Sequence, residues 1–151
     1  MVFKSFGGRA RFAGRVRTLR AFEDNALVRK VLEEEGAGQV LFVDGGGSLR
    51  TALLGGNLAR LAWERGWAGV VVHGAVRDTE ELRGVPIGLL ALAATPKKSA
   101  KEGKGEVDVP LKVLGVEVLP GSFLLADEDG LLLDREKFRQ CVFFIHEHIS
   151  G

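Results

Sequence analysis

The stretch from Val40 to Asp78 places the strongest constraint on how this chain can fold. It opens with a short apolar run, Val40–Val43, and a second apolar run lies in Gly69–His73. Between them, apolar residues in 55–65 recur at helical spacing, and Gly66 follows as a stop signal. A strand, a helix and a strand in so short a span form a crossover unit, which predicts two parallel strands. The fold class is therefore α/β.

The residues before this unit predict one more strand and one more helix. Phe12–Phe22 alternates between apolar and basic residues, which is typical of a half-buried strand. The segment that follows changes to helical spacing. Asp24 or Asn25 can cap the start of this helix, and Gly36 can end it.

The residues after the unit predict a change of architecture. Residues 85–95 are expected to form another strand. Residues 96–110 are polar and rich in Lys and Gly, which predicts an exposed hairpin or arm. Residues 111–133 consist of short apolar runs separated by Gly and Pro, as in a meander of strands. We therefore expect a mixed sheet or barrel: a parallel α/β half followed by a β half.

The last residues differ in character from the rest. Phe138, Val142, Ile145 and Ile149 fall on one helical stripe. This spacing predicts a C-terminal amphipathic helix that docks on the domain or on a protein partner. We interpret residues 1–133 as a single domain and residues 134–151 as a helical tail.

Composition narrows the classes of partner and compartment. The chain has 151 residues, a formal net charge of +1 and 27% charged residues, which favours neither a nucleic acid nor a membrane as partner. Its single cysteine, Cys141, excludes an internal disulfide framework and fits a reducing cytoplasm. The first residues do not show a signal-peptide pattern, and no apolar run reaches the ~20 residues that span a bilayer. The expected localisation is cytoplasmic.

The carboxyl ends of the predicted parallel strands are the place for a ligand site. Two glycines in Leu54–Asn57 start the connecting helix, so backbone N–H groups there can approach a small anion. Arg77 can add a planar fork for a carboxylate or enolate oxygen. Asp78 can supply an oxygen ligand to Mg²⁺ or Mn²⁺. Together these residues would form an anion-plus-metal site.

Two of these features also have structural interpretations. Asp78 and Glu81 have the spacing of a helix capping box, in which Asp78 caps and Glu81 reaches back. Gly45–Gly47 can be a tight turn, or a loop for a nucleotide or S-adenosylmethionine. Gly45–Gly47 lacks the G-x-G-x-x-G register of a dinucleotide loop, which argues against the ligand loop.

Other reactive residue types are weaker candidates. His73 is either a proton shuttle or a histidine satisfied by hydrogen bonds. His146 and His148 are two residues apart, so on a helix they would point apart and could not share a metal ion. Lys97, Lys98, Lys101 and Lys104 are expected on a solvated arm and not on an apolar strand, where burial would lower the pKa of an amine for Schiff-base chemistry. A lysine-dependent aldolase is therefore not expected.

The ordered motifs of residues 6–133 resemble one family. They include "FGGRARFAGRV", "VLFVDGGGSLRTALLGGNLARLAWERGWAGVVVHGAVRDTEEL", "PKKSAKEGKGEVDVP" and "PGSFLLADEDG". The chain is similar to the regulator of ribonuclease activity A family, which also contains class II 4-hydroxy-4-methyl-2-oxoglutarate aldolases. The aldolase signature of that family consists of one residue, twenty intervening positions, the pair Arg-Asp, two further positions and then Glu or Asp. Here it is met by Gly56, Arg77, Asp78 and Glu81.

The resemblance implies a fold, an assembly and a substrate cradle. Family members have a fold resembling swivelling β/β/α domains, assemble as rings of three and place their sites between subunits. A homotrimer is therefore expected. The backbone amides implied to cradle a pyruvate-like carboxylate belong to Gly55, Gly56, Asn57 and Leu58.

The resemblance also implies an activity. Arg77 would contact the keto oxygen of the substrate, Asp78 would hold a divalent metal, and Glu81 would order metal-bound water. The reaction would be aldol cleavage of 4-hydroxy-4-methyl-2-oxoglutarate to pyruvate, accompanied by oxaloacetate decarboxylase activity. The alternative is a non-catalytic protein that binds and inhibits a ribonuclease. A third label attached to the family, quinone-precursor methyltransferase, is the least favoured.

Overall fold

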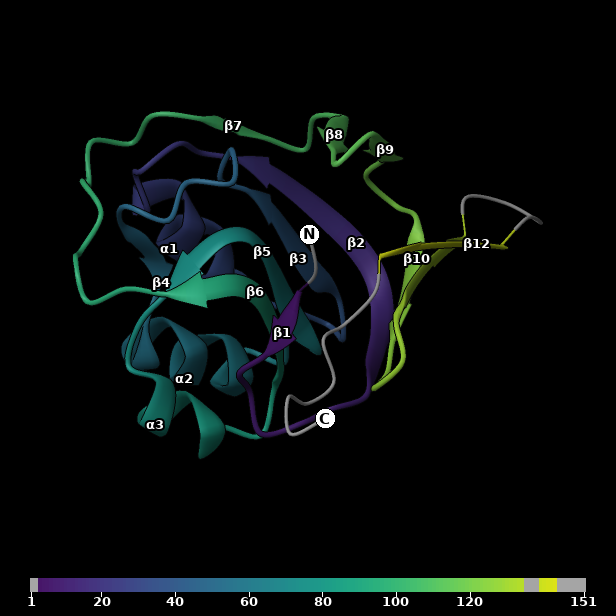
Figure 1. Ribbon diagram of the computed structural model, residues 1–151, viewed down its shortest axis with the longest axis horizontal. Coiled ribbons are helices and arrows are strands. Elements are labelled where there is room, and N and C mark those ends of the chain that lie inside the picture. Colours follow the sequence, from purple (N-terminus) through teal and green to yellow (C-terminus); the bar gives the residue numbers. More distant parts are fainter. Residues whose placement is uncertain (1–2, 135–138, 144–151) are drawn as a thin grey trace.

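The computed structural model describes residues 3–134 and 139–143. Within this part of the chain, ten strands form one curled sheet and two more form a separate hairpin (Figure 1). The order along the large sheet is β1-β6-β5-β3-β2-β10-β11-β12, with β4 beside β5 and β7 beside β2. The bounds of its strands are β1 Lys4–Ser5, β2 Phe12–Arg20, β3 Val40–Asp44, β4 Ala52–Leu54, β5 Gly69–Val76, β6 Gly88–Ala94, β7 Glu106–Val107, β10 Phe123–Ala126, β11 Leu131–Asp134 and β12 Arg139–Phe143.

The centre of this sheet is parallel, as the crossover unit predicts. Strand β3 pairs in parallel with β2 on one side and β5 on the other, and β5 pairs in parallel with β6. The helices between these strands are α1 Ala26–Leu32, α2 Gly56–Glu64 and α3 Thr79–Arg83. Because the strands are parallel, the carboxyl ends of β5 and β6 lie at the same edge of the sheet.

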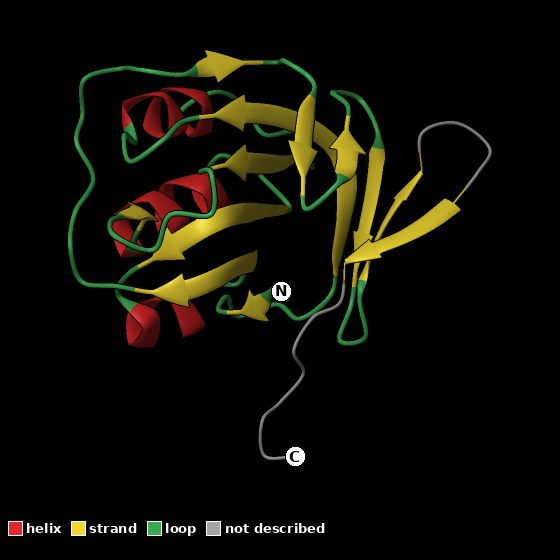
Figure 2. Ribbon diagram, turned by 45° about the horizontal axis from the view of Figure 1, so that its top comes forward, coloured by secondary structure: helices red, strands yellow, loops and turns green. Residues whose placement is uncertain are grey.

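Side-chain alternation along β3 divides the interior into two cores. Leu41 and Val43 point to the face that the helices cover, whereas Val40 and Phe42 point to the opposite face. The opposite core is closed by the second half of the chain, which includes β10, β11 and the hairpin of β8 Leu111–Val113 and β9 Val116–Val118. Figure 2 shows the helices on one side of the parallel strands and the β meander on the other. The predicted mixed architecture is confirmed.

The first helix starts where predicted but ends earlier. The Asp24 carboxylate accepts a hydrogen bond from the Ala26 N–H at 3.1 Å, whereas the side chain of Asn25 makes no capping bond. The helix ends at Leu32, before Gly36. Gly36 instead packs against Trp67, where an added Cβ would lie 2.5 Å from the Trp67 backbone nitrogen.

The polar segment 96–110 is an arm, not a hairpin. It leaves β6, runs along the edge of the sheet and joins β2 through β7 (Figure 1). Asp24 fastens it, because its carboxylate accepts the backbone N–H groups of Glu102 and Gly103 at 2.8 and 3.1 Å. Burial raises the pKa of Asp24, but hydrogen bonds from the backbone N–H groups of Ala26, Glu102, Gly103 and Lys104 together more than offset this and leave the pKa below its usual value.

The predicted C-terminal helix is wrong where the structure describes it. Arg139–Phe143 forms strand β12, which pairs antiparallel with β11 and places Arg139 beside Asp134. This segment is a strand because the edge of β11 offers it backbone hydrogen bonds. The spacing of its apolar residues does not determine its conformation alone. Most of the predicted stripe, with Phe138, Ile145 and Ile149, lies outside the described residues, as do His146 and His148.

No helix in the described part of the chain is long and apolar enough to cross a lipid bilayer.

Candidate functional site

The site begins where β5 ends. The backbone N–H of Arg77 donates to the carbonyl oxygen of Leu54 at 3.0 Å, which holds Arg77 beside the end of β4. Asp78 follows with φ 61° and ψ 46°, a left-handed conformation that Asp adopts more readily than most residues. This turn directs the chain from β5 into α3. It also turns the Asp78 side chain away from the helix that it precedes.

Asp78 binds the start of α2, not the start of its own helix. Its Oδ2 accepts the backbone N–H of Gly56 at 3.0 Å, and it makes no side-chain capping bond to α3. Glu81 does not reach back to Asp78; its carboxylate contacts the guanidinium of Arg60 on α2. The capping-box interpretation is therefore wrong. The D-x-x-E spacing instead places two carboxylates against the amino end of α2, where the helix dipole favours negative charge.

Two glycines make this close approach possible. A Cβ on Gly55 would lie 2.7 Å from Oδ2 of Asp78, and a Cβ on Gly56 would overlap the carboxyl group of Glu81. No side chain fits at either position without moving a carboxylate. These glycines were expected to give access to an anion, and the anions packed on them are Asp78 and Glu81.

A cavity of about 550 Å³ opens in front of these carboxylates. Arg77, Asp78 and Glu81 all line it, and Nη1 of Arg77 lies 3.8 Å from Oδ1 of Asp78. The side chains of Arg77 and Asp78 are about one-third exposed, 31% and 33%, so a small molecule can reach both. The remaining lining residues are Thr79, Glu80, Ala94, Thr95 and Pro96.

The wall formed by Ala94, Thr95 and Pro96 is a part of the site that sequence motifs did not reveal. These residues lie at and just after the carboxyl end of β6, the parallel neighbour of β5. The backbone N–H of Thr95 donates to the carbonyl of Val76 at 2.9 Å, which joins this wall to the strand that carries Arg77. The available signal was topological: a third parallel strand must end at the same edge.

Asn57 and Leu58 do not line this cavity. Both belong to the first turn of α2, where backbone N–H groups lack partners within the helix. The Asn57 side chain is exposed, and its Oδ1 accepts a hydrogen bond from Nη2 of Arg60 at 2.6 Å. The Leu58 side chain is buried in the helix-side core and borders a smaller cavity with Asn25 and Arg29.

The donor set fits a hydrated magnesium or manganese ion better than an all-protein metal cage. Within the described residues, no three His, Cys, Asp or Glu side chains are grouped to hold a metal. Mg²⁺ typically uses one or two carboxylates and keeps several waters. Asp78 offers such a carboxylate at the cavity, with Glu80 and Glu81 nearby on the same short helix. These residues suit a cation that remains largely hydrated.

The glycine turn after β3 is closed by its own hydrogen bonds. The N–H groups of Gly45 and Gly47 both donate to the carbonyl oxygen of His73, at 3.0 and 3.1 Å, and the N–H of Gly46 donates to the Asp44 carboxylate at 2.9 Å. These amides are therefore not directed toward a nucleotide. The tight-turn interpretation is favoured.

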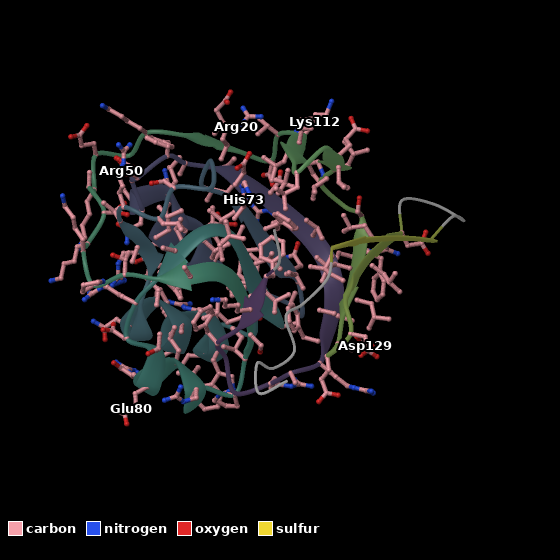
Figure 3. The ribbon with its side chains drawn as sticks, viewed as in Figure 1. Arg20, Arg50, His73, Glu80, Lys112 and Asp129 are labelled. Atoms are coloured by element: carbon pink, nitrogen blue, oxygen red, sulfur yellow. The ribbon has the colours of Figure 1, made fainter. Side chains whose placement is uncertain are left out.

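His73 lies in β5 and contacts this turn, and it does not line the cavity. Its Nδ1 lies 3.3 Å from Oδ1 of Asp44, and its side chain is 12% exposed. Burial raises the pKa of Asp44, but the His73 ring and the Gly46 N–H outweigh it and hold the pKa below its usual value. In Figure 3 the labelled side chains of His73 and Glu80 lie on different parts of the molecule.

Comparisons with known proteins agree with this fold and this motif order. A family model described as RraA-like, Aldolase/RraA, matches residues 2–133. A Thermus thermophilus protein named 4-hydroxy-4-methyl-2-oxoglutarate aldolase is 98% identical over 133 residues, which are 88% of this chain and 81% of the relative.

Solved structures agree as well. One described as the RNA-processing inhibitor RraA of Thermus thermophilus has a TM-score of 0.89 and 96% identity, covering 90% of this chain and 83% of its own. Another, described as an S-adenosylmethionine:2-dimethylmenaquinone methyltransferase of Geobacillus kaustophilus, has a TM-score of 0.88 and 48% identity, covering 91% and 86%. The extent of these matches, together with the shared fold, shows that the chain belongs to the RraA-like Aldolase/RraA family.

Proposed function

We propose that the protein is a divalent-metal-dependent aldolase that cleaves 4-hydroxy-4-methyl-2-oxoglutarate to pyruvate and also decarboxylates oxaloacetate. One observation carries the proposal: Arg77, Asp78 and Glu81 line a single cavity at the carboxyl end of a parallel strand. The aldolase name of the Thermus thermophilus relative supports the same reaction class. The cavity brings the Arg77 guanidinium and the carboxylates of Asp78 and Glu81 together, in a space where a keto acid can bind.

The roles of the chain's own residues follow from the charge that the reaction creates. Cleavage of the carbon–carbon bond leaves the enolate of pyruvate, and the Arg77 guanidinium donates hydrogen bonds to its oxygen. Removal of one donor of this type lowers kcat by a factor of about 10²–10³. Asp78 would hold the divalent cation, which when bound supplies further stabilisation of the same negative charge.

Two further groups complete the proposed site. Glu81 orders water in the cavity, and this water accepts the proton of the substrate hydroxyl as that carbon becomes a carbonyl. The family resemblance assigns the substrate carboxylate to the backbone amides of 55–58. These residues lie behind the carboxylates of Asp78 and Glu81 and do not themselves line the cavity. One of these amides, the Gly56 N–H, donates a hydrogen bond to Asp78.

The proposal extends to assembly and compartment. We propose a homotrimer, as the family resemblance implies, with each site completed at a subunit boundary. We also propose a cytoplasmic location, which the single cysteine fits. Sedimentation velocity measures the assembly directly. A monomer that turns over substrate as fast as the wild-type assembly would remove the need for a shared site.

The test is pyruvate release, measured with 4-hydroxy-4-methyl-2-oxoglutarate and with oxaloacetate. Rates are compared with Mg²⁺, with Mn²⁺ and after chelation, for the wild type and for Arg77→Ala. Arg83→Ala is the matched control, because Arg83 ends α3 without lining the cavity. Turnover should require metal and Arg77 but not Arg83. Equal rates with and without metal, or no pyruvate at all, contradict the proposal.

A second candidate function is inhibition of a ribonuclease by protein binding. It is favoured by the 96%-identical structure that is described as an RNA-processing inhibitor. An RNA-cleavage assay with a purified endoribonuclease tests it. Inhibition that is undiminished in Arg77→Ala, in a protein that releases no pyruvate, would establish this function in place of the first.

A further inference from the structure

Arg60 touches two residues of the proposed site and has no role in it so far. It lies on α2, one helical turn after Asn57. Its Nη2 donates to Oδ1 of Asn57 at 2.6 Å, and its Nη1 contacts the Glu81 carboxylate. Arg60 therefore connects the first turn of α2 with α3 through side chains alone.

An exposed ion pair of this kind contributes little to folding stability. The side chains of Arg60 and Glu81 are 44% and 42% exposed, so water screens their attraction. Stability alone gives no reason for the contact. Its consequence is geometric, because a planar guanidinium that binds Asn57 and Glu81 at once restricts the rotamer of both.

The position of Glu81 needs such a restraint. Its carboxylate packs on Gly56 while that of Asp78 packs on Gly55, so two like charges meet adjacent residues of one helix turn. Their repulsion would drive the more exposed Glu81 outward unless a cation held it. Within the described residues Arg60 is the basic side chain in contact with Glu81.

We propose that Arg60 is a positioning residue of the aldolase site, which acts by holding Glu81 against Gly56 at the edge of the cavity. This inference rests on the proposed function. Arg60 lies outside the set of residues that line the cavity, so it acts through Glu81 and not on the substrate.

The experiment compares Arg60→Gln, Arg60→Lys, Glu81→Gln and the double variant Arg60→Gln/Glu81→Gln with the wild type. Arg65→Gln is the control, because Arg65 is exposed at the end of the same helix. The measurements are kcat, KM for 4-hydroxy-4-methyl-2-oxoglutarate, the Kd for Mn²⁺ and the thermal midpoint.

Arg60→Gln should lower kcat by about 10- to 100-fold, the size typical of losing a partner that orients a site residue. KM and the thermal midpoint should change little, Arg60→Lys should recover part of the loss, and Arg65→Gln should match the wild type. The double variant should be no slower than Glu81→Gln. A wild-type kcat in Arg60→Gln, or losses that multiply in the double variant, would overturn the positioning role.

A wild type without turnover would refute the proposed function and not, by itself, the role of Arg60. In that case the Kd for Mn²⁺ decides. Arg60→Gln and Glu81→Gln should weaken Mn²⁺ binding by similar factors that do not multiply in the double variant. Independent factors, unchanged binding or no Mn²⁺ binding by the wild type would overturn the inference as well.

Discussion

Two parallel strands lead to an aspartate that packs near glycines, Asp44 at the end of β3 and Asp78 just after β5, and the two aspartates differ in their surroundings. After β3, the carboxylate of Asp44 accepts the N–H of Gly46 and faces the ring of His73. After β5, Asp78 accepts an N–H from a different helix and remains one-third exposed at a 550 Å³ cavity. The same residue types form a closed turn at one strand end and line a cavity at the other.

The difference lies in where the backbone donors come from. At the β3 end, the turn's own glycines donate to the carbonyl of His73 and to Asp44, so donors and acceptors close on one another. At the β5 end, the glycines form the start of α2, and their small size admits the carboxylates of Asp78 and Glu81 from α3 and the turn before it. A glycine run therefore indicates a ligand site only when its N–H groups are not already taken by its own turn.

The largest effect is expected from Asp78→Asn. Asn accepts the left-handed backbone and can still accept the Gly56 N–H, but it lacks the negative charge that would hold a cation. We expect kcat to fall by a factor of about 10²–10³ or more, while the thermal midpoint stays close to that of the wild type. Pyruvate release and thermal unfolding check this. Full activity in Asp78→Asn would mean that the β5 end is no more reactive than the β3 end.

Gly56→Ala should have the next largest effect. The added methyl would overlap the Glu81 carboxyl group, so the carboxylate or the helix must shift. We expect a loss of about 1–3 kcal/mol in the free energy of unfolding, together with slower turnover. Gly84→Ala is the control, since its methyl would come no closer than 3.5 Å to another residue. Equal urea midpoints for the two variants would contradict the close approach at Gly56.

Asp44→Asn tests the closed turn. The folded pKa of Asp44 lies below its usual value, so its ionised form adds stability above the unfolded pKa and loses it as pH falls through the folded value. The variant should be less stable than the wild type by about 1–2 kcal/mol near neutral pH. This difference should shrink below about pH 4. Unfolding measured from about pH 3 to about pH 7, on both sides of the usual Asp pKa, checks the trend. A gap that widens in acid would reverse the sign.

The smallest effect is expected from His73→Gln. His73 does not line the cavity, and its ring faces Asp44. Turnover should be unchanged, with a modest loss of stability from the lost contact with Asp44. Steady-state kinetics of the variant provide the check. A large fall in kcat at unchanged stability would restore the proton-shuttle interpretation and connect the two strand ends.

Local patterns predicted the parallel core because its signals are local. Apolar runs, a helical repeat and Gly66 all lie in the stretch that forms β3, α2 and β5. They also predicted that Arg77 and Asp78 stand at a strand end, which the structure confirms. Side-chain partners were harder to predict, because the capping-box spacing of Asp78 and Glu81 does not reveal that α2 supplies their partners.

The remaining differences depend on contacts between distant residues. Ala94, Thr95 and Pro96 reach the cavity because β6 pairs with β5, and no short motif marks them. Arg139–Phe143 is a strand because β11 offers it a hydrogen-bonding edge. Pairing of this kind selects strand over helix whatever the apolar spacing within five residues suggests.

The arm, residues 96–110, offers a position at which the chain could be opened to make a circular permutant. It is fixed at several points along its first half: Ala52 N–H donates to the carbonyl of Lys97, Ser99 Oγ donates to the carbonyl of Ala52, and Asp24 accepts the amides of Glu102 and Gly103. A cut just after these anchors, near Gly105, would leave both new ends tied to the body of the protein. The loop there is a natural place for new termini in a circular permutant, with the Thr95 wall of the cavity kept in place.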